Sequence, residues 1–246
     1  MLCSCDGWLD VLPNNEQVTD NYWQSKEDVE AVIASGYYYM RQCVHTLIKW
    51  GELRGGSLYA VSSSDAKLQD FSMTPSHPLC DWSDIYKVIG MANSVIMYAP
   101  GVNDKTYYEA IRNAHLSEAY FMRAYCYLLL VKNYRDVPLV LQAYVNDKAS
   151  FDMAKPTESE VLAQVKADVL AALELGAAKG TYEEEWQTKG RVTKCGILSF
   201  IPVTATSLFS SLTGTIPLTS RGIISPVCLL SATAAHCAPL HRLRSA

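Results

Sequence analysis

Few residues in this chain have the types and spacing that nucleophilic chemistry needs. Residues 62–65 read Ser-Ser-Ser-Asp and place hydroxyl groups next to a carboxylate, the groups from which a hydrolase takes its nucleophile and acid. No glycine-framed turn that would present a serine nucleophile surrounds them, so a loop with a helix cap is the favoured interpretation. Residues 183–185 are glutamates that could bind a cation, but such runs are typical of solvated surface. We therefore predict no catalytic residues, and a hydrolase is the least favoured class.

Metal and cofactor sites have equally little support. His77 and Cys80 lie close in sequence but supply two candidate ligands, against about four for a structural zinc site. Cys43 and Cys126 fall within apolar helical patterns, where a free cysteine is typically a small buried hydrophobic residue. No glycine-rich phosphate loop is present. The sequence thus predicts neither a metal site nor a bound cofactor.

The elements that carry these residues are predicted to be helices throughout. No strand-like alternation of comparable length competes with the helical period of the apolar residues. Ser25 with Asp28, and Thr157 with Glu160, fit the capping pattern at two helix starts, and Gly176 fits a helix stop. The predicted helices are Lys26–Trp50, Asp81–Tyr98, Lys105–Lys132 and Glu158–Leu175, with a stub after Thr193.

The segment Ala110–Pro138 is the most informative of these helices. Its apolar residues recur every three or four positions and share one wide face, while charged residues interrupt the run too often for a membrane span of about 20 residues. It is therefore predicted to be a core helix. His115 within it, and His45 in the first helix, are expected to be packed or surface histidines. The apolar face comprises Leu116, Tyr120, Ala124, Tyr127 and Val131, widened by Phe121, Tyr125 and Leu128.

Charge is distributed unevenly along the chain. The 21 basic and 25 acidic residues leave no basic excess for nucleic acid, yet every acidic residue lies at or before Glu185. Residues 195–246 contain no Asp, Glu, Asn, Gln, Lys, Tyr, Trp or Met, whereas Ser and Thr are frequent. Scattered prolines and hydroxyl groups break every apolar run there well short of a membrane span. We predict that a frameshift or gene disruption near residue 195 makes this tail non-native or disordered.

Residues 134–138, at the end of the core helix, read Tyr-Arg-Asp-Val-Pro. With the helix before them they resemble a stretch of the SusD/RagB family that closes on Tyr-Gly-Asp-Val-Pro. Arg135 stands where the family usually has glycine, and it would be strained if that position requires a positive φ. Further stretches resemble the family in the same order. They are Cys5–Arg41, Gly51–Gly56 with Gly56 in place of an acid, Trp82–Ile96 with Tyr86, Ile89 and Asn93, and Gly190–Lys194. The matching residues of the core helix are Glu118, Arg123, Ala124, Tyr125, Tyr134, Asp136, Val137 and Pro138.

The resemblance implies an all-α, SusD-like helical fold with tetratricopeptide-like helix pairs, incomplete at its C-terminus. Similar proteins are lipid-anchored on the outer face of the outer membrane of Bacteroidetes. There they capture glycans or other nutrients for a SusC-like TonB-dependent transporter, without known catalysis. We therefore expect a surface-exposed outer-membrane lipoprotein whose partners are that transporter and an oligosaccharide or other nutrient. The alternative is a helical-repeat protein-interaction module without carbohydrate binding.

The resemblance also divides the chain. Residues 2–5, Leu-Cys-Ser-Cys, fit a lipobox, so Cys5 is the expected lipidation site. Only four residues precede Cys5, whereas a working signal needs an apolar segment of about 7–15 residues. We predict a remnant of the lipoprotein signal and lipobox at 1–5, a SusD-like N-terminal helical domain at 6–194, and the non-native or disordered tail at 195–246.

Arg54, Tyr59 and Trp82 are the expected ligand contacts. They lie in or beside a long segment without a helical pattern, and long loops on rigid scaffolds often carry binding sites. Aromatic rings stack on the apolar faces of sugars, and arginine hydrogen-bonds their hydroxyl groups. Trp82 also keeps helical spacing with Tyr86 and Asn93, so a packing role is favoured for it.

Overall fold

The computed structural model describes residues 22–144, 155–176 and 190–200. In these ranges every regular element is a helix, which confirms the all-α prediction. The long helices are α2 (Lys26–Ile48), α4 (Ser83–Tyr98), α5 (Glu109–Tyr134) and α6 (Glu158–Leu175). The short ones are the π-helical turn η1 (Lys49–Leu53), α3 (Ser63–Gln69), the 3-10 turns η2 (Pro78–Cys80) and η3 (Ala99–Gly101), and a helical segment at 194–200.

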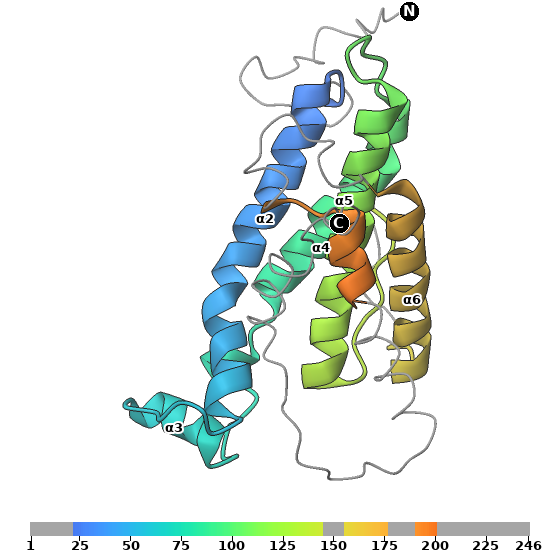
Figure 1. The fold of residues 1–246 in the computed structure, drawn as a ribbon. Coiled ribbons are helices and arrows are strands. Elements are labelled where there is room, and N and C mark those ends of the chain that lie inside the picture. The colour runs from blue at the N-terminus through green and yellow to red at the C-terminus, as the bar shows by residue number, and fades with distance from the viewer. Residues whose placement is uncertain (1–21, 145–154, 177–189, 201–246) are drawn as a thin grey trace, which may run out of the picture.

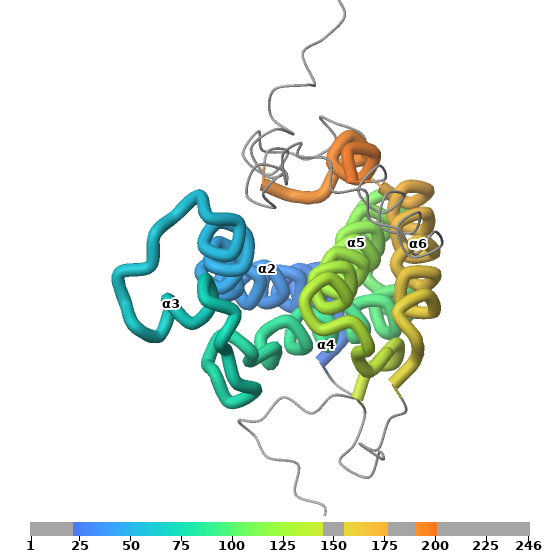
Figure 2. Tube along the Cα trace, turned by 90° about the horizontal axis from the view of Figure 1, so that it is seen from below, coloured from blue at the N-terminus to red at the C-terminus, as the bar shows by residue number. Residues whose placement is uncertain are grey.

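Helix α5 lies at the centre of the fold (Figures 1 and 2). It packs against both α4 and α6, and α4 also packs against α2. Figure 2 shows residues 194–200 on the side of α5 away from α4. There the Phe200 ring meets the Phe121 ring, with 5.2 Å between centroids. The helices thus form two pairs, α2 with α4 and α5 with α6, in the predicted tetratricopeptide-like arrangement. Within the described ranges, no helix is both long and apolar enough to cross a membrane.

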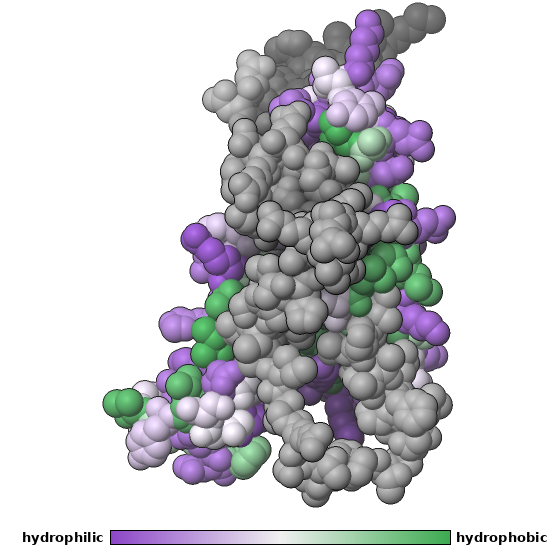
Figure 3. All heavy atoms as spheres, in the orientation of Figure 1, coloured by the Kyte–Doolittle hydropathy of each residue, from purple (hydrophilic) through white to green (hydrophobic). Residues whose placement is uncertain are grey.

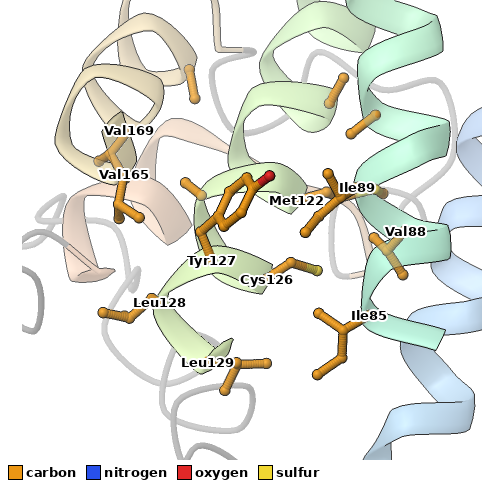
Figure 4. Close-up of a cluster of buried hydrophobic side chains, with 14 of the residues drawn as sticks. Ile85, Val88, Ile89, Met122, Cys126, Tyr127, Leu128, Leu129, Val165 and Val169 are labelled. Carbon is orange, nitrogen blue, oxygen red and sulfur yellow. The ribbon is translucent and has the colours of Figure 1, made fainter. Parts of the chain in front are cut away.

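Tyr127 occupies the middle of the core, between apolar residues of α4 such as Ile89 and of α6 such as Val165 (Figure 4). Its hydroxyl donates to the Val140 carbonyl at 2.9 Å and accepts from the Val140 N–H at 2.6 Å. The buried hydroxyl therefore has hydrogen-bond partners in place of water. Ala124, Tyr127 and Val131 of the predicted apolar face are all buried, so the prediction of a core helix is confirmed.

Local hydrogen bonds fix helix ends where the capping pattern predicts them. The Asp28 carboxylate accepts the Ser25 N–H at 2.8 Å. The Glu160 carboxylate likewise accepts the Thr157 N–H at 2.8 Å. Each bond satisfies one of the amide groups that a helix start leaves without a partner. Helix α6 consequently begins and ends at the predicted residues, with Gly176 following it.

Two element predictions were wrong in detail. Helix α5 begins at Glu109 instead of Lys105, because the Asp104 carboxylate accepts the Thr106 N–H at 2.8 Å and holds a turn there. The segment predicted to be non-helical contains α3. Ser62 caps this short helix, in agreement with the predicted cap, by accepting the Asp65 N–H at 3.2 Å. A helix of two turns is too short to show a clear apolar period.

The boundary predicted at residue 195 falls inside a helical segment. Residues 194–200 are helical, and the Ile197 and Phe200 side chains are buried against the core. The rest of the predicted tail, Cys5 and the glutamates at 183–185 lie outside the described residues. The division of the chain at 195 therefore stays a prediction.

Replacing Arg135 with glycine is expected to stabilise the fold. Arg135 follows α5 with φ 62° and ψ −98°, a region that favours glycine, so the conditional prediction of strain is met. Relief of this strain is expected to raise the free energy of unfolding by about 1 kcal/mol, measured by urea unfolding. Asp136→Gly is the matched control. Asp136 is also exposed but has no positive φ, so its replacement gains nothing from relieved strain. Equal effects of the two changes would contradict the strain argument.

Candidate functional site

The segment after α2 forms a tight turn that requires glycine. The N–H groups of Ser57 and Leu58 both donate to the Glu52 carbonyl, at 2.9 and 3.2 Å. A Cβ on Gly55 would lie 2.7 Å from the Gly51 carbonyl oxygen, closer than real contacts allow, and Gly56 has φ +77°. The glycine that departs from the family pattern at 56 thus suits its backbone conformation. This turn directs the chain out towards α3.

The chain beyond the turn is held against α3 by Gln69. The Gln69 amide donates to the Leu58 carbonyl at 2.7 Å and accepts the Ala60 N–H at 3.1 Å. Tyr59 lies between these two anchored residues. Buried residues beneath the segment form a small separate core. This core consists of Leu53, Ala60, Leu68 and Leu79.

Two aromatic side chains are exposed here, Tyr59 within the anchored segment and Phe71 just after α3. Tyr59 is 86% exposed and Phe71 is 79% exposed, and Val61 beside them is also exposed. Phe71 has φ 53°, an uncommon conformation of the kind that occurs at functional sites. Figure 3 shows apolar atoms on the outer edge of the region around α3. We call Tyr59, Val61 and Phe71 the loop surface.

A pocket of about 290 Å³ lies between α4 and the segment Pro138–Tyr144. The Trp82 ring meets the Tyr86 ring edge-on, with 5.8 Å between centroids, and the Tyr134 ring at 4.9 Å. The Tyr86 hydroxyl donates to the Pro138 carbonyl at 2.7 Å, and burial raises the pKa of Tyr86. We call this the aromatic pocket. It is lined by Trp82, Tyr86, Ile89, Gly90, Pro138, Val140 and Tyr144, none of which is charged.

The three predicted ligand contacts lie in different surroundings. Arg54 is exposed, and its guanidinium donates to the Asn133 side chain at 3.3 Å near the end of α5. Trp82 lies at the same end of α5, against Tyr134, and lines the aromatic pocket. Tyr59 belongs to the separate loop surface.

Sequence reasoning missed Phe71 on the loop surface, the anchoring role of Gln69, and Tyr86 and Tyr144 in the pocket. Phe71 lies in the long segment before Trp82 that was predicted to carry the ligand contacts. Nothing in the sequence shows which aromatic residues of that segment are exposed. Tyr86 had a recognisable helical spacing that indicated packing alone. Tyr144 approaches α4 only through the tertiary fold, so no local pattern could reveal it.

The contact between the Ser64 hydroxyl and the His77 ring is unsuited to nucleophilic catalysis. His77 Nε2 lies 3.0 Å from Ser64 Oγ, but His77 Nδ1 accepts the Leu79 N–H at 3.2 Å. The ring proton is therefore assigned to Nε2, which donates towards Ser64 and has no lone pair to take its proton. Asp65 is paired with Lys49 at 2.8 Å. Among the described residues, no three His, Cys, Asp or Glu side chains form a group that could hold a metal ion.

Two charged residues of α5 that match the family pattern, Arg123 and Glu118, form buried pairs. Arg123 binds Asp168 through two hydrogen bonds, of 2.7 and 2.8 Å, and donates to Asn93 at 2.9 Å. Glu118, fully buried, pairs with Arg191 at 2.9 Å across 73 residues of sequence. These groups join the helices to one another. Their partners lie inside the fold, so they do not belong to a ligand site.

Comparison with known proteins gives consistent matches. A family model described as starch-binding and associating with the outer membrane matches residues 7–202. A SusD-like protein of Formosa agariphila is 29% identical over 177 residues, which cover 69% of this chain and 34% of that relative. The chain thus spans about a third of the length of the curated relatives it matches.

Solved structures agree on the fold. A SusD superfamily protein from Bacteroides thetaiotaomicron superposes with a TM-score of 0.67 at 22% identity, covering 76% of this chain and 45% of the other. A laminarin-binding SusD-like protein superposes with a TM-score of 0.60 at 21% identity, covering 81% of this chain and 46% of the other. With the family match extending over most of the sequence and the helix pairs in place, the chain belongs to the SusD-like family.

Proposed function

We propose that this protein captures oligosaccharides at the bacterial cell surface and that the loop surface contacts them. The observation that carries the proposal is the exposure of Tyr59 and Phe71, with Tyr59 held between two residues that Gln69 anchors. Exposed aromatic rings held in place can stack on the apolar faces of sugar rings at little further cost in conformational entropy. The Arg54 guanidinium supplies hydrogen-bond donors for sugar hydroxyl groups.

Laminarin and starch are the glycans to test first. The family description names starch, and one structural neighbour is a laminarin-binding protein. Family members of this kind bind carbohydrate, which supports binding without catalysis here. The unsuitable proton position on His77 also argues against hydrolysis at Ser64.

The proposed cellular setting follows the family. Cys5 is the proposed lipidation site, through which the protein would be anchored to the outer membrane with its helical domain at the cell surface. A SusC-like TonB-dependent transporter is the proposed partner that takes up the captured glycan. Mass spectrometry of the N-terminal peptide from outer-membrane fractions tests the anchor, since a peptide without lipid on Cys5 would count against it.

Replacing Tyr59 or Phe71 with alanine is expected to weaken binding of laminarin or starch about tenfold each, because each change removes one stacking ring. Affinity gel electrophoresis and isothermal titration calorimetry measure the change. Tyr38→Ala is the matched control, since Tyr38 is 54% exposed on α2 and lies outside the loop surface.

The results separate the candidate functions. If the protein binds glycan but both loop variants bind as tightly as the wild type, the loop surface is not the site. If the wild type binds no glycan but retains a transporter or peptide, the alternative of a helical-repeat protein-interaction module is favoured.

A further inference from the structure

Gly90 is unusual because the packing of the protein does not require it. Glycine in the middle of a helix is destabilising relative to alanine. In α2, a Cβ on Gly36 would lie 3.1 Å from the Met122 sulfur, so close packing accounts for that glycine. A Cβ on Gly90 would meet no atom within 4 Å, although Gly90 lies in the middle of α4. The space beside it belongs to the aromatic pocket.

We propose that the aromatic pocket binds one neutral pyranose ring of a glycan and that Gly90 keeps the pocket open for it. This inference rests on the proposed function and adds a second contact to the loop surface. At about 290 Å³ the pocket is at the small end of the range for ligand sites, which suits a single ring and not a chain.

The chemistry of the lining favours a sugar ring over a charged or purely apolar group. No charged residue lines the pocket, so an anionic or cationic ligand would find no counter-charge there. Trp82, Tyr86 and Tyr144 supply aromatic surface for the apolar face of the ring. Because the Tyr86 hydroxyl donates its proton to Pro138, its oxygen can accept a hydrogen bond from a sugar hydroxyl.

Both walls of the pocket are fixed before any ligand binds. One wall is the rigid helix α4, which carries Tyr86 and Gly90. The other is the segment Pro138–Tyr144. The Asn93 amide holds this segment by donating to the carbonyls of Val140 and Gln142, at 3.0 and 3.3 Å. Such preorganisation lowers the loss of conformational entropy that opposes binding.

Gly90→Leu fills the pocket and is the decisive variant, with Gly90→Ala as a milder second variant. Both are expected to fold with a Tm no lower than that of the wild type, because the added atoms begin in open space and the helix gains a better helix former. Lys87→Leu is the control, since Lys87 is an exposed residue of α4 that does not line the pocket. The probes are short gluco-oligosaccharides from laminarin and starch, with binding followed by calorimetry on the full chain.

We expect Gly90→Leu to weaken short-oligosaccharide binding at least tenfold, Gly90→Ala to weaken it less, and Lys87→Leu to leave it unchanged. Tyr59→Ala is expected to affect the polysaccharide more than the short probe. If the wild type binds the short probe and a folded Gly90→Leu variant binds it equally well, the pocket inference is overturned while the loop surface stands. If the wild type binds neither probe nor polysaccharide, the proposed function fails and the pocket inference falls with it.

Discussion

Replacing Asp168 with asparagine is expected to lower the free energy of unfolding by about 3–5 kcal/mol. The Arg123 and Asp168 side chains are only 6% and 2% exposed, and their charges lie 2.7 Å apart. The variant keeps the shape of the side chain but leaves the Arg123 guanidinium in the core without a counter-charge. Uncompensated buried charge is costly because water cannot solvate it. Urea unfolding at neutral pH, followed by circular dichroism, measures the loss.

A surface pair supplies the control. Lys87 and Asp84 are similarly close, at 2.8 Å, but their side chains are 49% and 41% exposed, so water screens their attraction. Lys87→Gln is therefore expected to change stability far less than Asp168→Asn. The double variant Arg123→Met with Asp168→Leu removes both charges and is expected to recover part of the loss. Similar losses for Asp168→Asn and Lys87→Gln would contradict the assignment of a structural role to the buried pair.

The same network explains why a buried arginine is tolerated. Asn93 accepts a hydrogen bond from Arg123, and Gln164 donates to Asp168 at 2.8 Å. Through the Asn93 amide the network also holds the wall of the aromatic pocket at Val140. The family-like residues of α4 and α5 thus mark how the helices and the pocket wall are joined. A ligand in the aromatic pocket would contact the wall that this network holds in place, and not the charged side chains themselves.

The sequence was sufficient for the elements that depend on local chemistry. Helix α6 was predicted at both ends because a capping box and a following glycine define them. The core position of α5 followed from the width of its apolar face. At Arg135 the sequence predicted strain only on the condition of a positive φ, and the structure supplies that condition with φ 62°.

The features that could not be predicted from the sequence depend on contacts between residues that are distant in the chain. Glu118 and Arg191 both lie in stretches that resemble the family. No pattern in the sequence indicates that these two residues bind each other. The aromatic pocket needs Trp82 and Tyr144 to approach across the fold, and periodicity assigned Trp82 to packing. Whether an aromatic residue such as Tyr59 points outwards also depends on long-range anchoring, here by Gln69.

Protonation of His115 is expected to lower the free energy of unfolding by about 3 kcal/mol as the pH decreases from about 6.5 to about 4. His115 is buried and contacts the Tyr107 hydroxyl at 3.2 Å. Burial, with smaller effects of the positive charges of Arg191 and Lys26, lowers its pKa from 6.5 to about 4. The unfolded chain therefore binds a proton in this range while the folded chain does not. Added protons therefore favour the unfolded state. The contribution of His115 to the free energy of unfolding is fully present above the pKa of His115 in the unfolded chain, and it is lost as the pH falls towards the pKa in the folded chain.

His115→Gln removes the titrating ring while keeping a polar group near Tyr107. Its stability is expected to fall less steeply between pH 6.5 and 4 than that of the wild type, measured by urea unfolding at several pH values. His45→Gln is the matched control, because His45 is an exposed histidine of α2 that lies outside the core. Carboxylates also titrate near the lower end of this range, so the difference between the two variants is the informative quantity. Equal slopes for His115→Gln and the wild type would show that His115 does not couple folding to pH.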